Sequence, residues 1–340
     1  MPPETLEIPT KTTDLNSKDM LQQAADDLFI ERASLILPNR LGRLLLKPHS
    51  VIDRPPDDVT LLDQYMIEAD PSKTSKMLKK FEQRTSNLAA VTDHLDEVVT
   101  RYELTNYKNL MLLSPHTTMP DILGVCYLTH LSETLGQNRS PMDNYMYLSR
   151  LLGYADYIHP FSRRRTNVAK DHISPLTNII QVFPDTKSTQ SLRELHGPAV
   201  QRANLRSSMA MAKHQREKPT DAQQLVLLAP SGSQMKKYKN GKRTESISPT
   251  TFDLIHRSYR SDTPILICGF DFDFPRAYLK IPALQKDQQG RIKLVKQPIT
   301  FATEAPIMPE QQLTREQLEI AIKARLLTVA RTVSQKAIYA

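Results

Sequence analysis

Residues 109–121 read NLMLLSPHTTMPD, and this stretch decides the expected fold. The apolar run 109–113 has the length and composition of a strand that is buried on both faces of a sheet. The segment 121–135 has helical spacing and begins directly after Pro120, a position that favours the start of a helix. A buried strand followed at once by a helix is the repeating unit of α/β proteins.

Three more short apolar runs repeat this pattern along the chain. They are residues 178–183 (NIIQVF), 225–229 (LVLLA) and 264–268 (PILIC). Residues 278–281 are a further candidate strand, and Thr314 with Gln317 forms a capping-box pattern before a helix that runs to about residue 336. The sequence therefore predicts an α/β domain over residues 104–340, with a mixed sheet flanked by helices.

The first hundred residues differ from the rest in charge and in pattern. Apolar residues follow helical spacing over 17–37, about 59–70 and about 74–101. Residues 1–100 carry 12 basic and 17 acidic side chains, whereas the remaining residues carry 33 and 20. We therefore expect residues 1–103 to form a smaller helical N-terminal domain ahead of the α/β domain.

Cysteine usage and hydropathy limit the class of protein. Cys126 and Cys268 are the only cysteines among 340 residues, which excludes a disulfide framework and a zinc site built mainly from thiolates. The N-terminus lacks the pattern of a signal peptide, and no apolar run approaches the length of about 18 residues that suggests a transmembrane helix. We expect a protein of the cytoplasm or of an organelle stroma, soluble or peripherally bound to a membrane.

Basic side chains concentrate in one region of the chain. Residues 161–260 hold 18 basic and 7 acidic side chains, within a chain of net charge +8. Such a region suggests an anionic partner, namely nucleic acid, an anionic membrane or a phosphate-bearing small molecule. A solubilising surface is the alternative. No nucleic acid is expected as partner, because the region lacks interleaved aromatic residues and any known module signature.

His116 and Asp121 form the sharpest local feature. They are separated by four residues and lie between the end of an apolar strand and the start of a helix, where α/β proteins commonly have their sites. A carboxylate beside a histidine orients the imidazole and stabilises its charged form, which makes the histidine a general base. Such a spacing also occurs by chance.

Residues 225–243, LVLLAPSGSQMKKYKNGKR, are the second feature. A predicted strand ends in a turn at Gly232, one of only nine glycines, and a cluster of basic residues follows. A tight turn there would bring backbone N–H groups and hydroxyls close to an anion. A basic surface hairpin is the alternative. Lys187, which follows the strand 178–183, and the arginines of 162–165 are further candidates for binding phosphate.

Other chemistries find less support in the sequence. A serine nucleophile would need a G-x-S-x-G elbow, which is absent. Cys126 lies on the apolar side of a predicted helix, which favours a core position over a nucleophile. Residues 268–273 are acidic enough for a metal ion, but the end of a strand explains them as well. No metal site and no redox cofactor is expected.

Taken in order, these motifs resemble the glycerophospholipid acyltransferase family, most closely the soluble chloroplast-type glycerol-3-phosphate acyltransferases. That family has an H-x4-D motif after a strand, here His116 and Asp121, and a later strand that ends in a Pro-x-Gly block. The chloroplast-type block reads Ala-Pro-Ser-Gly-Gly, and residues 229–233 read APSGS. Two departures are Pro115, where the family usually has Asn, and Gln234, where it has Arg.

The resemblance implies a mechanism. His116 would take the proton from the acceptor hydroxyl as that oxygen attacks the thioester, and Asp121 would orient His116. The acceptor phosphate would be bound by five residues of the basic region: Lys187, Ser231, Gly232, Lys236 and Lys237. The donor would be acyl-CoA or acyl-carrier protein, the acceptor glycerol 3-phosphate, and an anionic membrane a peripheral contact. The alternative is a catalytically inactive homologue that binds anionic lipid or a protein partner.

Overall fold

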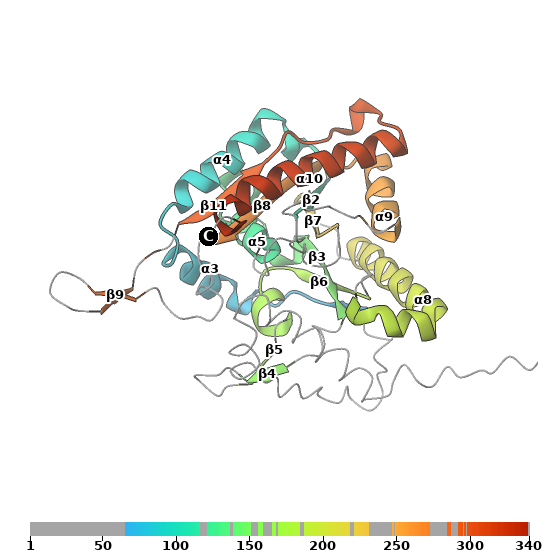
Figure 1. Ribbon diagram of the computed structural model, residues 1–340, viewed down its shortest axis with the longest axis horizontal. Helices are drawn as coiled ribbons and strands as arrows, with labels where there is room; N and C mark the ends of the chain where they lie inside the picture. The colour runs from blue at the N-terminus through green and yellow to red at the C-terminus, as the bar shows by residue number, and fades with distance from the viewer. Residues whose placement is uncertain are drawn as a thin grey trace, which may run out of the picture.

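Residues 109–113 form strand β2 (Asn109–Leu113), as predicted, in a seven-stranded mixed sheet of the computed structural model (Figure 1). The strand order is β1-β6-β3-β7-β2-β8-β11. The structure describes residues 65–115, 121–136, 139–150, 156–158, 165–167, 169–183, 187–217, 221–230, 247, 249–272, 284–286, 292–294, 296 and 298–338. The expected helix 17–37 and strand 278–281 lie outside these residues.

Five neighbouring strands of the sheet are parallel. They are β6 (Asn178–Val182), β3 (Asn144–Ser149), β7 (Gln224–Leu228), β2 and β8 (Ile265–Phe272). The edge strands β1 (Met66–Ile67) and β11 (Ile299–Thr303) are antiparallel to β6 and β8. Two separate hairpin-like pairs are β4 (Asp156–Ile158) with β5 (Arg165–Asn167), and β9 (Leu284–Lys286) with β10 (Ile292–Leu294).

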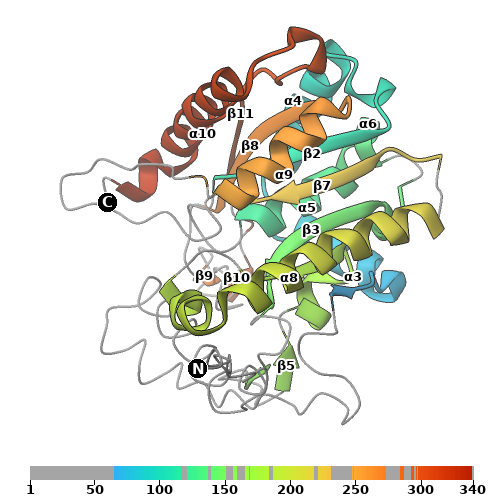
Figure 2. The same cartoon turned by 90° about the vertical axis from the view of Figure 1, so that its right-hand side faces the viewer.

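Helices cover both faces of the sheet. One face carries α3 (Thr74–Glu82), α4 (Leu88–Arg101), α5 (Asp121–Leu131) and the short α6 (Glu133–Gly136). The other face carries α8 (Lys187–Glu217), α9 (Pro249–Arg260) and α10 (Arg315–Ile338). Figure 2 looks onto this second face, with α8 and α9 in front of the sheet.

Side chains alternate between two hydrophobic cores along each strand. In β2, Leu110 and Leu112 belong to the core under α3, α4 and α5, whereas Met111 and Leu113 belong to the core under α9 and α10. All four are at most 2% exposed. The period of two is a property of the pleated backbone, and burial on both sides explains why the predicted strands are continuous apolar runs.

The sequence prediction was correct for most central elements and wrong for two. The runs 109–113, 178–183, 225–229 and 264–268 are confirmed as strands. Thr314 caps α10 as predicted, because Gln317 N–H donates to Thr314 Oγ1 over 3.3 Å and Thr314 N–H donates to Gln317 Oε1 over 2.9 Å. The expected helix 59–70 is wrong over its described part, since residues 66–67 form β1.

The expected helix 74–101 is two helices instead of one. α3 and α4 are separated at residues 83–87. Within this break the side chain of Asn87 binds strand β11: its Nδ2 donates to Ile299 O over 2.8 Å, and its Oδ1 accepts from Ile299 N–H over 2.9 Å. Both helices contribute to the same core as β2. Whether residues 1–103 form a separate helical domain stays a prediction, because residues 1–64 lie outside the described part.

Residues 200–217, which belong to the basic region 161–260, form the second part of helix α8, an element that the sequence did not predict. Pro198 lies inside this helix, and Figures 1 and 2 show α8 as two stretches that run in different directions. A proline removes a helical N–H and clashes with the preceding turn, which accounts for the bend. In the described part of the chain, no helix combines the length and the apolar character needed to cross a membrane.

Candidate active site

The carboxyl ends of five parallel strands lie along one edge of the sheet. Each neighbouring pair among β6, β3, β7, β2 and β8 is parallel, so the chain leaves all five strands on the same side. Ligands of α/β proteins bind outside the carboxyl ends of the strands, where the connecting loops and helix N-termini gather. We therefore expect a reaction site at this edge of the sheet.

The two motifs singled out by the sequence follow neighbouring strands. β2 and β7 are adjacent and in register, with Leu113 opposite Leu228, and the backbone N–H of Ser114 donates to Leu228 O over 3.1 Å. The chain continues from β2 toward the H-x4-D motif and from β7 toward the APSGS block. Two segments that are far apart in the sequence therefore begin from adjacent strands at one edge of the sheet.

Two of the predicted site residues fall within described helices. Asp121 is the first residue of α5, and Lys187 is the first residue of α8. β6, which precedes Lys187, is three strand positions from β2, or about 14 Å at the usual spacing of neighbouring strands. Asp121 therefore follows the carboxyl end of β2, and Lys187 follows the carboxyl end of β6, further along the same edge of the sheet. The other predicted residues, His116, Ser231, Gly232, Lys236 and Lys237, lie outside the described residues.

Ser114 is a polar residue at this edge that the sequence did not single out. Its side chain is 2% exposed, and its Oγ has no hydrogen-bond partner among the described residues. A buried hydroxyl without a partner is costly, and such groups are uncommon in folded proteins. No sequence signal distinguished this serine, because a serine between a strand and a proline is ordinary in a turn.

Arg150 is a second residue that sequence reasoning missed. It follows β3 directly, and its guanidinium is fully buried. Nη2 donates to Ser207 Oγ over 3.2 Å and to Gln181 O over 3.4 Å, while the rings of Tyr65 and Phe183 lie 5.3 and 5.2 Å from the guanidinium carbon. These contacts join β3 to β6 and α8. The buried guanidinium also adds a positive charge near the carboxyl edge of the sheet.

The tyrosines of β3 attach helix α8 to the sheet. Tyr145 Oη lies 3.0 Å from His214 Nδ1, and both side chains are buried. Burial, with a smaller contribution from Asp143, raises the pKa of Tyr145 to about 12. The phenol is thus held neutral. This contact attaches the part of α8 after Pro198 to β3.

Both cysteines are core residues rather than nucleophiles. Cys126 and Cys268 are fully buried, and burial raises the pKa of each thiol to about 12. A thiol must lose its proton to attack or to bind a metal ion, so neither is reactive near neutral pH. Cys126 lies in the core, as its position on the apolar side of the helix indicated.

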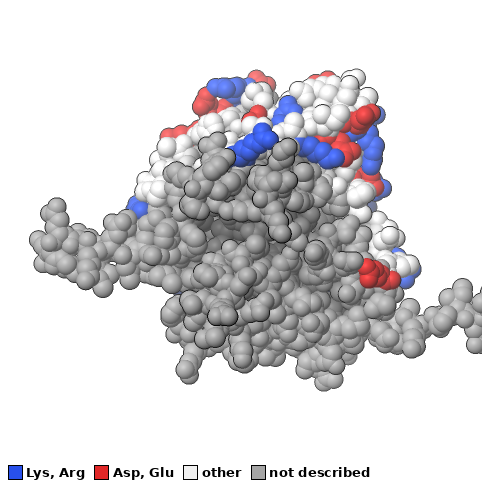
Figure 3. Space-filling view, in the orientation of Figure 1, with Lys and Arg blue, Asp and Glu red and all other residues white. Residues whose placement is uncertain are grey.

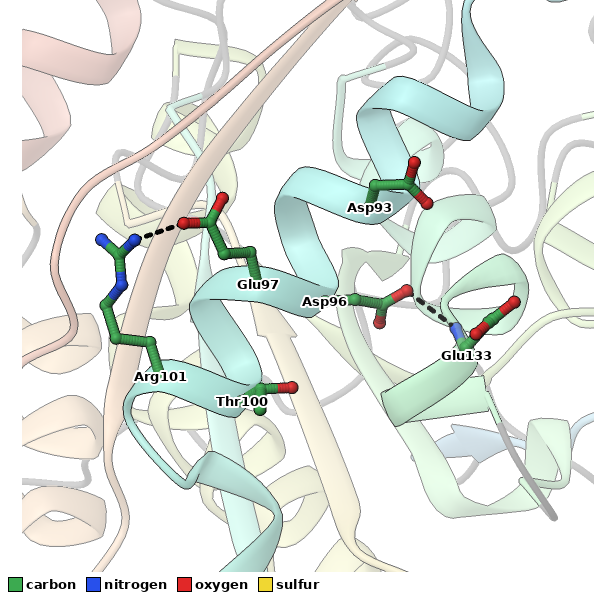
Figure 4. Close-up of a pocket in the computed structure, with 6 residues that line it drawn as sticks. All are labelled: Asp93, Asp96, Glu97, Thr100, Arg101 and Glu133. Carbon is green, nitrogen blue, oxygen red and sulfur yellow. Dashed lines mark hydrogen bonds and ion pairs between the residues drawn. The ribbon is translucent and has the colours of Figure 1, made fainter.

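An acidic pocket lies between α4 and α6, at the end of α5 opposite Asp121. Figure 4 shows the six residues that line it: Asp93, Asp96, Glu97, Thr100, Arg101 and Glu133. Asp96 accepts hydrogen bonds from the backbone N–H groups of Glu133 and Thr134, each over 3.0 Å, and from two hydroxyls. Glu97 pairs with Arg101. Asp96 thus caps a short helix and Glu97 balances a charge, which gives two of these carboxylates a structural role.

Basic and acidic side chains are mixed on the one face of the molecule that Figure 3 draws. On the face drawn in Figure 3, basic and acidic side chains of the described residues alternate without forming a patch of one sign. Among the described residues, no group of three or more His, Cys, Asp and Glu side chains could hold a metal ion.

No protein-family model matches this chain, and no curated protein matches it. The candidate site therefore rests on the order and register of the strands and on the residues that follow them.

Proposed function

We propose that this chain is an acyltransferase of the glycerol-3-phosphate O-acyltransferase type. It would move a fatty acyl group from an acyl thioester to a hydroxyl of glycerol 3-phosphate, the first step of phospholipid synthesis. The observation that supports this proposal best is the adjacency of β2 and β7 at the carboxyl edge of the sheet. Through it, the segments that contain the proposed base and the proposed phosphate-binding turn start about 5 Å apart.

The proposed reaction needs one base and one route for the displaced thiol. His116 takes the proton from the acceptor hydroxyl while the oxygen attacks the thioester carbonyl. The tetrahedral intermediate collapses, the carbon–sulfur bond breaks, and the thiolate leaves and takes up the proton from His116. Asp121 orients the imidazole and stabilises its charged form. The balance requires no metal ion and no redox cofactor, and the co-substrate is acyl-CoA or acyl-carrier protein.

The acceptor phosphate is assigned to the segment after β7. Backbone N–H groups near Ser231 and Gly232, with the ammonium groups of Lys236 and Lys237, suit a phosphate dianion. Lys187, the fifth residue assigned to the acceptor phosphate, begins α8 at the same edge but follows a strand about 10 Å from β7. Binding of both substrates at one edge supplies much of the rate through orientation.

A substitution at His116 tests this reaction. Purified His116→Ala is assayed for thiol release from acyl-CoA and from acyl-carrier protein, with glycerol 3-phosphate as acceptor. Loss of a general base lowers the rate by about 10²- to 10⁴-fold. His94→Ala is the matched control, because His94 is an exposed residue of α4 and is no part of the proposed site. An unchanged rate in His116→Ala overturns the mechanism.

A non-catalytic homologue that binds anionic lipid or a protein partner is the second candidate, supported by Pro115 and Gln234 at positions where the related family has Asn and Arg. A matrix of donors and acceptors, read by mass spectrometry of the lipid product, separates the two. Product with at least one donor supports the enzyme. Binding without turnover for every pair supports the non-catalytic candidate.

A further inference from the structure

Helix α8 exposes large apolar side chains between basic ones. Among the described residues, Leu205 and Met209 are 56% and 61% exposed, and they lie one turn apart on this helix. The exposed residues Arg202, Lys213 and Arg216 continue the same spacing of three or four residues on either side. Residues at this spacing share one face of a helix. The five side chains, Arg202, Leu205, Met209, Lys213 and Arg216, form the α8 ridge.

The α8 ridge points away from the protein core. The opposite face of the helix packs on β6 and β3 through Val200, Ala203, Ser207 and His214, each at most 5% exposed. Ser207 Oγ donates to Gln181 O over 2.6 Å, which fixes the rotation of the helix about its axis. The orientation of the ridge is therefore set by buried contacts, and its apolar members have no internal role that would explain them.

The charges of the ridge favour an anionic partner. Its three basic residues bracket the two apolar ones, and the nearest acidic residue on the helix is Glu217, whose carboxylate lies 3.5 Å from Lys213 Nζ. Both members of that pair are more than 60% exposed, so the pair is weak and leaves Lys213 able to meet another anion. Arg216 Nε donates to Ala212 O over 3.2 Å, which keeps its guanidinium close to the ridge.

We propose that the α8 ridge docks this protein on an anionic lipid surface. Leu205 and Met209 enter the boundary between headgroups and acyl chains, and the three cations bind the lipid phosphates around them. Basic side chains that flank apolar ones on an exposed helix face are typical of helices that lie in a membrane interface. Projecting apolar side chains on a convex helix suit a deformable lipid surface better than a rigid protein partner. The proposal stands whether or not the proposed acyl transfer is correct.

Sedimentation with lipid vesicles tests the proposal on the full chain. The probes are vesicles of phosphatidylcholine alone and of phosphatidylcholine with phosphatidylglycerol, each at low and high salt. We expect binding to the anionic vesicles only, and weaker binding at high salt because exposed charges are screened. Arg202→Gln/Lys213→Gln/Arg216→Gln lowers the partition coefficient about 100-fold, since each cation at an anionic surface contributes about fivefold. Leu205→Ser/Met209→Ser lowers it roughly 30-fold.

Matched control variants test whether binding depends on the α8 ridge itself or only on the overall positive charge and exposed apolar residues of the protein. Lys76→Gln/Lys79→Gln/Lys80→Gln removes three exposed charges from α3, and Ile320→Ser removes an equally exposed apolar side chain from α10. Both controls retain wild-type binding if the ridge is the docking surface. No binding of the wild type to anionic vesicles overturns the proposal, as does an equal loss in controls and ridge variants. Capture by polyglutamate without any vesicle binding also overturns it, in favour of an acidic protein partner.

Discussion

The backbone N–H of Ser114 donates to the carbonyl oxygen of Leu228 over 3.1 Å, which joins the end of β2 to the end of β7. The two residues are 114 positions apart in the sequence. Only the strand order β3-β7-β2-β8 brings them together, because β7 enters the sheet between two strands that precede it in the chain. The H-x4-D motif and the APSGS block therefore begin from one place in the fold.

A designed disulfide tests this juxtaposition directly. Ser114→Cys/Ala229→Cys extends the register of Leu113 with Leu228 by one residue, so the two Cα atoms lie about 5 Å apart, within the range that a disulfide spans. We expect mild oxidation to form the bond, detected by mass spectrometry of a proteolytic digest. The native Cys126 and Cys268 are fully buried and do not compete.

Ser114→Cys/Phe183→Cys is the matched control for that experiment. Phe183 follows β6, three strand positions from β2, or about 14 Å away. A disulfide in this control with none in the test pair would contradict the strand order, and with it the basis of the proposed active site.

The contact between α5 and β8 requires glycine at position 124. A Cβ atom on Gly124 would lie 2.2 Å from Cδ1 of Phe270, a fully buried ring at the centre of the core. Gly124→Ala is therefore expected to lower the free energy of unfolding by about 1–3 kcal/mol, although alanine favours a helix by about 1 kcal/mol. Urea unfolding followed by circular dichroism measures the difference.

A double-mutant cycle shows whether Phe270 causes that loss. Phe270→Leu leaves a smaller side chain near position 124, so Gly124→Ala should cost less in the Phe270→Leu background than in the wild type. Equal cost in both backgrounds would mean that the clash with Phe270 is not the cause.

The sequence predicted the centre of the sheet because burial on both faces leaves mostly apolar residues in β2, β6, β7 and β8. It did not predict β3, whose residues Asn144, Tyr145 and Tyr147 carry polar groups that hydrogen-bond or contact groups outside the strand. It missed helix α8 because apolar residues are few there, and the buried face of the helix includes Ala203, Ser207 and His214 instead of a stripe of large apolar side chains. The two-residue strand β1 exists through its pairing with β6 rather than through its own pattern.

The candidate site could be predicted only in part for a related reason. The sequence shows that a histidine follows a predicted strand. It does not show that β2 and β7 are neighbours, because the order of the strands depends on packing over the whole sheet. Arg150 was not predicted, because its burial depends on Tyr65 and Phe183, which come from distant parts of the chain.

Asp96 is expected to stabilise the fold through the start of α6. Burial raises the pKa of this carboxyl, but the hydrogen bonds from Ser132, Thr134 and Glu133 outweigh burial and lower it below the usual 3.8. Asp96→Ala removes these acceptors and should cost about 2 kcal/mol, by analogy with the loss of a helix cap. Asp93→Asn, at an exposed position of the same pocket, is the control and should change stability by about 0.5 kcal/mol or less.

The pH dependence of Asp96 has a definite sign. A carboxyl whose pKa is lower in the folded state contributes stability that is present above pH 3.8 and is lost as the pH falls through the lower, folded-state value. Asp96→Ala should therefore converge with the wild type in strongly acidic solution. A difference that stays constant down to the acid transition would show that the carboxylate charge is not involved.

His130 is expected to control stability in a separate, milder range of pH. Burial lowers the pKa of this histidine below 6.5, while a hydrogen bond to Leu176 O, 2.7 Å from Nε2, opposes the shift. A base whose pKa is lower in the folded state binds its proton more readily when unfolded. Stability is therefore complete above pH 6.5 and falls as the pH decreases toward the folded-state pKa.

A glutamine at position 130 tests that dependence without removing the contact. His130→Gln can still donate to Leu176 O but cannot titrate, so its free energy of unfolding should vary less than that of the wild type from pH 6.5 downward. His94→Gln, at an exposed position of α4, should keep the wild-type slope. Identical slopes for His130→Gln and the wild type would assign the pH dependence to other groups, because the imidazole of His130 would then titrate alike in both states.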